Sequence, residues 1–212
     1  EHLAIHQVSS EQTGNNGHAI HAIDGNINTI WHTAYNGSDS NKTIIIKLDG
    51  PVYLSALQYV PRQNGSNGRA KNATLYVSLD GENWSVASSA TNWENSASSK
   101  VIKLDESIKC QYIKFVINEN WGDGRSFASA AMINLFEDIT KKAIPTAEIE
   151  YDITEKTSKN VTAKLVNPST EITITNNNGS NVYTFKENGE FTFEFVDKYG
   201  NKGTATAVVD WI

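Results

Sequence analysis

Short segments in which β-branched and aromatic residues alternate with polar residues recur along this chain at intervals of about ten residues. Residues 43–48 and 52–60 form the first such pair, and Asp49-Gly50-Pro51 between them supplies a turn signal. No long segment shows the periodicity of about 3.6 residues that an amphipathic helix requires. The pattern predicts an all-β sandwich and excludes helical bundles and doubly wound sheets. Further strands are predicted at residues 74–79, 100–104, 112–117 and 132–136.

The composition changes around residues 140–145, where loops rich in glycine and aromatic residues give way to Thr, Val and Lys in tighter alternation. A chain of 212 residues is long enough for two domains with separate cores. We therefore predict two domains, residues 1–140 and residues 141–212. In the second domain, three phenylalanines at a period of two predict a buried strand face, followed by a hairpin turn at Gly200-Asn201. Its predicted strands are 147–151, 161–166, 172–175, 183–185, 191–196 and 204–211.

The charge balance argues against a nucleic-acid partner. The net charge is −6 and the longest basic run is Lys141-Lys142, whereas nucleic-acid-binding proteins concentrate Lys and Arg on one face. No apolar run approaches the ~18 residues of a membrane-spanning helix, and no charged and then apolar leader opens the chain. We expect a soluble fragment whose export signal was removed or lies outside it. Cys110 is the only cysteine, which excludes an internal disulfide and predicts a buried structural thiol.

Sequence motifs of common catalytic sites are absent. The chain has no Gly-x-Ser-x-Gly, no His-Glu-x-x-His and no phosphate-binding Gly-x-x-x-x-Gly-Lys, and no histidine is flanked by an evident carboxylate partner. His18 and His21 have a spacing that could hold a metal on a helical turn, but without a third ligand two partly exposed histidines are the simpler interpretation. Residues 24–28 resemble the start of an EF-hand calcium loop. The match fails at the sixth position of the loop, where Thr29 replaces the glycine, and at the twelfth, where Tyr35 replaces the glutamate.

The stretch from Ala22 to Thr33 concentrates oxygen ligands, a tryptophan and an imidazole. Asp24 and the turn carbonyls would suit a hard cation, and His32 would suit a polar ligand. Such polar and aromatic mixtures bind neutral polyols, because hydroxyls pair with amides and guanidinium groups while C–H faces pack on rings. The alternative is that the aromatic residues close the ends of the sandwich and the polar groups cap strands. The remaining loop candidates are Tyr35, Arg62, Asn67, Trp121 and Phe127.

Four strings stand in a characteristic order: Ala22-Ile23-Asp24-Gly25-Asn26 with Thr29 and Trp31-His32-Thr33, then Pro61-Arg62-Gln63-Asn64-Gly65, then Val77-Ser78-Leu79-Asp80-Gly81-Glu82-Asn83-Trp84, and finally Ser126-Phe127-Ala128-Ser129-Ala130-Ala131-Met132-Ile133. Together they resemble the family 32 carbohydrate-binding modules, which have the discoidin-type galactose-binding fold. The resemblance covers residues 1–139. It implies an eight-stranded jelly roll that binds galactose-type sugars through loops at one end.

The resemblance also implies roles for individual residues. Its hydrogen-bonding trio corresponds to His32, Arg62 and Asn67, which would bind the sugar hydroxyls, including the axial O4 of galactose. Phe127 corresponds to the aromatic residue that packs on the apolar face of the sugar, and Tyr35 to a second aromatic wall. The last candidate for the sugar site is Trp121. The resemblance places the two other tryptophans of these strings, Trp31 and Trp84, in the core.

The same family implies a structural calcium ion. Its ligands would be the carbonyls of His21, Asn26 and Ala131, the Asp24 carboxylate, and the hydroxyl and carbonyl of Thr29. The family motif usually continues with a glutamate where this chain has Met132, and a thioether cannot replace a carboxylate around a hard cation. The site thereby loses one of two formal negative charges. Calcium is accordingly expected to be weak, completed by water, or absent.

Residues 144–212 resemble the small immunoglobulin-like domains strung between modules of bacterial surface enzymes, through Phe195-Val196-Asp197 and Gly200-Asn201-Lys202-Gly203-Thr204. The resulting hypothesis is a monomeric, non-catalytic lectin-like module with a spacer, from a larger secreted or cell-surface bacterial enzyme. Its expected partners are host glycans that end in galactose or N-acetylgalactosamine, and the other modules of the enzyme. An alternative is a protein- or phospholipid-binding adhesin of the discoidin type, which the polar loops and acidic charge disfavour. A third, that the fragment is itself an enzyme, lacks a nucleophile and base that pair.

Overall fold

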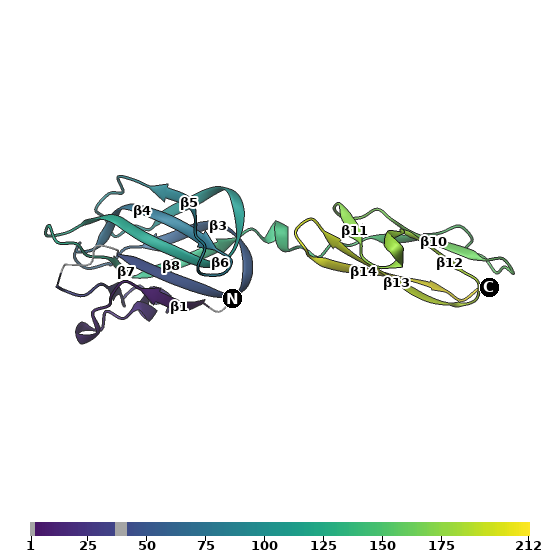
Figure 1. Cartoon of the computed structure of the whole chain (residues 1–212), viewed down its shortest axis with the longest axis horizontal. Helices are drawn as coiled ribbons and strands as arrows, with labels where there is room; N and C mark the ends of the chain where they lie inside the picture. Colours follow the sequence, from purple (N-terminus) through teal and green to yellow (C-terminus); the bar gives the residue numbers. More distant parts are fainter. Residues whose placement is uncertain (1–2, 37–41) are drawn as a thin grey trace. The chain divides into compact units, whose positions relative to one another are not determined.

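The computed structural model describes residues 3–36 and 42–212, and the chain divides into two compact units, Glu1–Asp138 and Ile139–Ile212 (Figure 1). The sequence predicted a boundary after Thr140, which lies within the short 3₁₀ segment η3 (Ile139–Lys142) that begins the second unit. Within the described ranges, no helix has the length and apolar character needed to cross a bilayer.

The first unit is all-β, as predicted. Five strands are hydrogen-bonded in the order β1-β3-β6-β4-β5 (Figure 1). In addition, β8 pairs with the C-terminal half of β3, and β2 pairs with β7. Two short 3₁₀ segments, η1 (Thr13–Asn15) and η2 (Ala19–Ala22), lie between β1 and β2. The strands are β1 (Leu3–Val8), β2 (Trp31–His32), β3 (Thr43–Val60), β4 (Arg69–Ser78), β5 (Ser85–Ala90), β6 (Lys100–Trp121), β7 (Ser129–Ala130) and β8 (Met132–Glu137).

The strands β3 and β6 are longer than the sequence predicted. Residues 43–48 and 52–60 were expected as two strands separated by a turn, but the structure joins them in one strand with a register irregularity between Lys47 and Val52. Pro51 is tolerated there because a bulge leaves a position without a ladder hydrogen bond. The first half of β3 pairs with β1 and the second half pairs with β8, so one long strand joins both of these strands to the sheet. One core takes side chains from both halves: Ile44, Ile46, Leu48, Leu54, Leu57 and Tyr59.

Of the residues predicted to be buried in the first unit, Trp31 and Cys110 are buried and Trp84 is not. Trp31 is fully buried and its Nε1 donates to the Ser10 carbonyl at 3.0 Å. Cys110 is also fully buried, as predicted, and burial raises the pKa of its thiol to about 12. Trp84 is a correction: it is only half-buried, because its ring lies on the sheet surface under the Lys114 ammonium, 4.4 Å from the ring centroid.

The second unit contains two three-stranded antiparallel sheets, in the orders β12-β10-β9 and β11-β13-β14. They share one core in which Phe193 and Phe195 are buried, while Phe191 is half-buried and stacks on Tyr183 at 3.8 Å. The turn between β13 and β14 falls at the predicted position, with Gly200 at φ +87°. The strands are β9 (Glu148–Tyr151), β10 (Val161–Val166), β11 (Ile172–Ile174), β12 (Val182–Phe185), β13 (Gly189–Asp197) and β14 (Lys202–Val209), and η4 (Asn177–Gly179) follows β11.

Candidate carbohydrate site

A hollow of about 240 Å³ lies among loops at the strand ends of the first unit, and we call it the loop pocket. It is lined by His32 of β2, Tyr35 just after it, Arg62 and Asn67 of the β3–β4 loop, and Arg125 and Phe127 of the β6–β7 loop. Five of the six predicted site residues therefore meet in one place. Arg125 joins them without having been predicted, and Trp121 is missing.

The β3–β4 loop is held against β7 by a close backbone approach at Gly68. The Gly68 N–H donates to the Trp121 carbonyl at 3.0 Å, and the Gly68 carbonyl accepts from the Ser129 N–H at 2.9 Å. The Ser129 hydroxyl donates to the Asn67 carbonyl at 3.0 Å. Gly68 has φ +81°, and a Cβ there would lie 2.7 Å from the carbonyl carbon of Ala128. Only glycine fits this position, which sets Asn67 beside the loop that carries Phe127.

A second set of bonds joins the segment after β2 to the Phe127 loop. The Thr33 N–H donates to the Ala128 carbonyl, and the Ala128 N–H donates to the Thr33 hydroxyl, each at 2.9 Å. Thr33 is fully buried. These bonds bring the ring of His32 to 5.1 Å from that of Phe127 and 4.9 Å from that of Tyr35, between ring centroids.

His32 presents a hydrogen-bond acceptor to the loop pocket. Its Nδ1 lies 2.6 Å from the Thr33 carbonyl, which can only accept, so Nδ1 carries the proton and Nε2 keeps its lone pair. The residue is 2% exposed, and this burial lowers the pKa of His32 below its ordinary value. The hydrogen bond to Thr33 opposes that shift in pKa, and the charge of Arg62 adds to it. His32 is therefore neutral at pH 7.

Arg62 presents donors to the same pocket. Its Nε donates to the Asn64 carbonyl at 2.6 Å and its Nη1 to the Asn67 carbonyl at 3.4 Å. Within the described ranges, no carboxylate lies within ion-pair distance of this half-buried guanidinium. Burial lowers the pKa of Arg62, although a guanidinium keeps its charge at any physiological pH. The remaining N–H groups are available to a ligand.

Sequence reasoning did not identify Arg69, which holds the Arg62 backbone in place. The Arg69 guanidinium donates to the Arg62 carbonyl from Nε at 3.1 Å and from Nη2 at 2.9 Å, and Nη2 also reaches the Gln63 carbonyl at 3.2 Å. Arg69 is the first residue of β4, a strand that pairs with both β5 and β6. The loop carrying Arg62 is thereby tied to the sheet. Nothing in the local sequence pattern distinguishes this arginine from an ordinary strand residue.

Phe127 is enclosed more deeply than a sugar-stacking platform would be. It is 2% exposed, and the Arg125 guanidinium carbon lies 5.1 Å from its ring centroid. Arg125 is ion-paired with Asp123, whose carboxylate also accepts from Asn67 Nδ2 at 3.4 Å. Tyr35, which is 46% exposed, is the open aromatic wall. The only signal for Arg125 in the sequence is a basic residue two positions before Phe127 in a glycine-rich loop.

Trp121 is a correction to the predicted site. It is the last residue of β6, its Nε1 donates to the Trp93 carbonyl at 2.8 Å, and the Lys71 ammonium lies 5.2 Å from its ring centroid. The strand pairing of Trp121 with Arg69 places it beside the pocket wall instead of in the pocket lining.

The predicted calcium ligands fit a cation in part. Asp24 Oδ1 accepts from the Asn26 N–H at 2.8 Å, and Asp24 Oδ2 lies 2.7 Å from the Thr29 hydroxyl. That hydroxyl also lies 2.8 Å from the Asn26 carbonyl, and its single proton cannot serve both oxygens well. Three oxygens thus converge as a hard cation requires. Ala131 is fully buried, Met132 brings no charge, and within the described ranges no three His, Cys, Asp or Glu side chains cluster.

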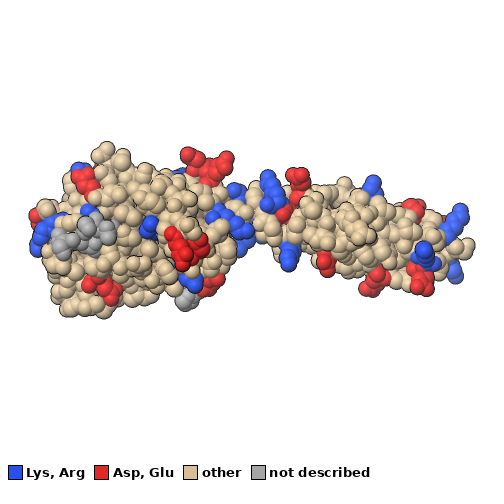
Figure 2. Space-filling model, viewed as in Figure 1, with Lys and Arg blue, Asp and Glu red and all other residues tan. Residues whose placement is uncertain are grey.

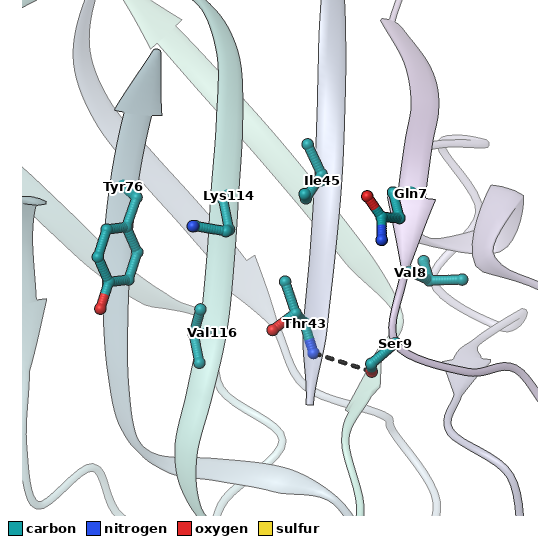
Figure 3. Close-up of a pocket in the computed structure, with 8 residues that line it drawn as sticks. All are labelled: Gln7, Val8, Ser9, Thr43, Ile45, Tyr76, Lys114 and Val116. Carbon is teal, nitrogen blue, oxygen red and sulfur yellow. Dashed lines mark hydrogen bonds between the residues drawn. The ribbon is translucent and has the colours of Figure 1, made fainter. Parts of the chain in front are cut away.

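A larger hollow of about 450 Å³ lies on the outer face of the sheet, across β1, β3, β6 and β4 (Figure 3). Figure 3 shows Lys114 pointing towards Tyr76, whose ring centroid lies 4.6 Å from the ammonium. On the opposite side, the Ser9 hydroxyl accepts from the Thr43 N–H at 3.0 Å. The lining has one ring and one cation, Tyr76 and Lys114, which contact each other, and its other residues are aliphatic or uncharged and polar. The loop pocket has the more convergent set of donors, acceptors and rings, so it is the candidate site.

Three comparisons place these features among known proteins. The family model for the F5/8 type C domain matches residues 5–133. A Clostridium perfringens structure, CpGH89CBM32-5 in complex with GalNAc-beta-1,3-galactose, is 38% identical and covers 63% of this chain and 94% of its own, with a TM-score of 0.57. The family 32 carbohydrate-binding module from C. perfringens NanJ, in complex with galactose, is 28% identical over 63% of this chain and 92% of its own, with a TM-score of 0.56.

A sialidase of Micromonospora viridifaciens is 37% identical over 86 residues, which are 39% of this chain but 13% of the sialidase. The chain therefore spans about an eighth of that relative. The family model, by contrast, matches well over half of the chain, and its limits enclose all the strands that position the loop pocket except the ends of β1 and β8. The chain therefore belongs to the F5/8 type C domain family.

Proposed function

We propose that the first unit is a non-catalytic carbohydrate-binding module that takes terminal galactose or N-acetylgalactosamine in the loop pocket. The observation that supports this most strongly is the meeting of His32, Tyr35, Arg62, Asn67 and Phe127 around one hollow of about 240 Å³. The similar Clostridium perfringens modules were solved with GalNAc-beta-1,3-galactose and with galactose, which supports the same class of sugar here.

The proposed recognition follows from donors and acceptors. His32 Nε2 accepts a hydrogen bond from a sugar hydroxyl, and Arg62 donates a hydrogen bond to the oxygen of the same or the neighbouring hydroxyl. Asn67 adds a side-chain amide, which offers both donor and acceptor atoms. Tyr35 supplies an apolar wall for the C–H face of the sugar. An axial O4 suits this arrangement because it projects a hydroxyl towards the hydrogen-bonding side while the opposite face stays apolar.

A small pocket of this kind binds weakly. Charge-assisted hydrogen bonds from Arg62 contribute about 1.5–3 kcal/mol and aromatic packing about 1 kcal/mol. The total should stay near about 4–7 kcal/mol, which corresponds to millimolar to micromolar dissociation constants. Tight attachment to a surface would then require several modules or sites acting together.

Titration calorimetry of the whole chain with galactose and N-acetylgalactosamine tests the proposal. Saturable binding is expected, and Tyr35→Ala should weaken it about fivefold because it removes a packing contribution near 1 kcal/mol. Tyr53→Ala is the matched control, since Tyr53 lies on β3 outside the loop pocket. Absence of saturable binding for both sugars contradicts the proposal. Binding to liposomes without a sugar response would instead favour the phospholipid-binding alternative.

The pH dependence of sugar binding should report the protonation of His32. Its folded-state pKa lies below the ordinary 6.5, so the neutral acceptor form predominates at pH 7 and above. Affinity should be constant from pH 8 to 7 and fall as the pH drops through the lowered pKa, when Nε2 gains a proton and becomes a donor. His32→Gln should bind more weakly but without this step, whereas His6→Gln should keep it. A step that survives His32→Gln would contradict the assignment.

The Asp24 loop is proposed to hold calcium weakly, with water completing the shell. Millimolar calcium should raise the Tm of the first unit by roughly 2–4 °C, the shift that about 1 kcal/mol produces in a protein of this size. Met132→Glu restores the second carboxylate and should enlarge the shift, while Met132→Gln, similar in shape but uncharged, should not. If calcium shifts the Tm of neither the native chain nor Met132→Glu, the site does not bind calcium.

The wider proposal concerns the protein to which this chain belongs. We infer an accessory part of a larger secreted or cell-surface bacterial enzyme, with the second unit as an immunoglobulin-like spacer and the module acting as a monomer on host glycans. Two three-stranded sheets around one core support the spacer assignment. On the face shown in Figure 2, uncharged residues predominate and charged side chains are scattered in small groups, without the concentrated basic patch that a nucleic-acid partner requires. A glycan array tests the host-glycan assignment. If the protein binds none of the arrayed glycans that end in galactose or N-acetylgalactosamine, the assignment is wrong.

A further inference from the structure

Two guanidinium groups line the loop pocket, and the proposed sugar recognition uses only one of them. Arg62 and Arg125 both line the same hollow of about 240 Å³. The carboxylate of Asp123 is ion-paired with Arg125 and accepts from Asn67. No ion pair joins a second carboxylate to either arginine within the described part of the chain. The pocket therefore presents two positive charges against one negative charge.

Arg125 still has donors to offer. Its Nε donates to Asp123 Oδ2 at 3.1 Å, and its Nη2 donates to the same oxygen. A guanidinium carries five N–H groups, and these two bonds leave those on Nη1 without an acceptor among the described residues. One N–H on Nη1 and the second N–H on Nη2 point the same way in one plane, and such a pair matches two oxygens of a carboxylate or a sulfate better than it matches a single hydroxyl.

Arg125 also occupies the position in which a neutral sugar would gain most from Phe127. The guanidinium carbon lies 5.1 Å from the Phe127 ring centroid, and Phe127 is 2% exposed. A sugar C–H face therefore meets less of this ring than an open platform would offer. What the pocket presents on this wall is a cation.

The cation is held in position before any ligand arrives. The Arg125 N–H lies 3.4 Å from Asp123 Oδ1, so backbone and side chain of Arg125 both engage the same carboxylate. Asp123 in turn reaches Asn67 across the pocket wall. The bonds to Asp123 already restrict the exposed Arg125 side chain, which lowers the entropic cost of its contact with a ligand anion.

We propose that Arg125 is a specificity-determining residue that makes the loop pocket prefer galactose-type sugars carrying an anionic group, a carboxylate or a sulfate, over neutral galactose. The inference rests on the proposed function, because His32, Arg62 and Asn67 must still bind the sugar hydroxyls. Arg125 binds the anionic group through its Nη1 edge, and Asp123 positions Arg125.

Calorimetric titration of the whole chain at low salt, with four probes, tests this. The probes are galactose, galactose 6-sulfate, galactose 3-sulfate and galacturonic acid, so that the position and the chemistry of the anion are separated. At least one anionic sugar should bind about threefold to fivefold tighter than galactose, the range expected for one exposed ion pair. Raising the salt concentration should reduce this advantage while leaving galactose binding nearly unchanged.

The decisive variant is Arg125→Gln, which removes the charge and keeps a polar side chain. The anionic preference should disappear, and the affinity for galactose should stay the same or rise, because the Phe127 ring becomes more open. Lys47→Gln is the matched control: Lys47 is exposed on β3 and lies outside the loop pocket, so the same charge is lost without touching the site.

The possible outcomes separate the two proposals. If native protein binds galactose but no anionic probe more tightly, or if Arg125→Gln weakens all probes equally, the inference about Arg125 is wrong while the carbohydrate-binding function stands. Loss of the preference in Lys47→Gln would assign it to overall charge and also overturn the inference. If neither galactose nor any anionic probe binds, both proposals fail.

Discussion

Arg62→Ala is expected to reduce galactose binding by a factor of about 10–100, because charge-assisted hydrogen bonds are worth about 1.5–3 kcal/mol. Since the whole site supplies only about 4–7 kcal/mol, this loss moves the affinity to the edge of detection. Arg62 makes this large difference because its two protein contacts, to the carbonyls of Asn64 and Asn67, leave several N–H groups for the ligand. Arg62→Lys should be intermediate, since it keeps the charge but loses the planar fork.

Two observations distinguish a lost ligand contact from a disturbed loop. The Tm of Arg62→Ala should fall only slightly, because Arg69 still holds the backbone of residue 62 through its carbonyl. Arg69→Lys, which loosens that clamp but keeps Arg62, should weaken binding less than Arg62→Ala does. Native-like affinity in Arg62→Ala would contradict the proposed binding site.

Gly68→Ala is expected to cause a large loss of stability in the first unit. Its φ of +81° costs an L-residue roughly 1–2 kcal/mol, and a Cβ 2.7 Å from the Ala128 carbonyl carbon adds overpacking of about 1–3 kcal/mol. The Tm of the first unit should therefore fall by roughly 5–15 °C. Sugar binding should weaken as well, because Gly68 joins the Asn67 loop to β7. Scanning calorimetry and titration calorimetry measure the two effects.

Gly124→Ala is the matched control for this prediction. Gly124 has nearly the same φ, +83°, but a Cβ there would meet no atom within 4 Å. It should therefore show the backbone cost alone, a Tm lower by a few degrees at most. Equal shifts for the two variants would mean that the close approach to Ala128 contributes nothing.

The strands and the core followed from local patterns, and the exceptions have identifiable causes. Period-two alternation correctly predicted strand structure at residues 43–48 and 52–60, but the turn signal at Asp49-Gly50-Pro51 was misleading, because a bulge absorbs it and the strand continues. Trp84 was expected in the core, yet Lys114 across the sheet provides a cationic partner for its ring at the surface. The strand propensity of a segment depends only on its own residues, so it does not predict contacts with side chains of other strands.

Most residues that line the loop pocket could be predicted from the sequence. His32, Tyr35, Arg62, Asn67 and Phe127 were assigned from residue chemistry and family resemblance, and the structure brings all five together. Trp121 was assigned on the same grounds, but strand pairing turns it to Trp93 and Lys71. Loop residues have no periodicity, so their direction depends on what the neighbouring loops contact.

The sequence by itself predicted the all-β class, the two-part organisation and five residues that line the loop pocket, because alternation, residue chemistry and family motifs can be recognised in single segments. Tertiary structure alone decided that Arg125 covers Phe127, that Arg69 holds the Arg62 backbone and that Gly68 admits the close approach to Ala128. Each of these depends on contacts between loops, and the bond between Thr33 and Ala128 joins residues 95 positions apart. Only packing of the whole sandwich sets such distances.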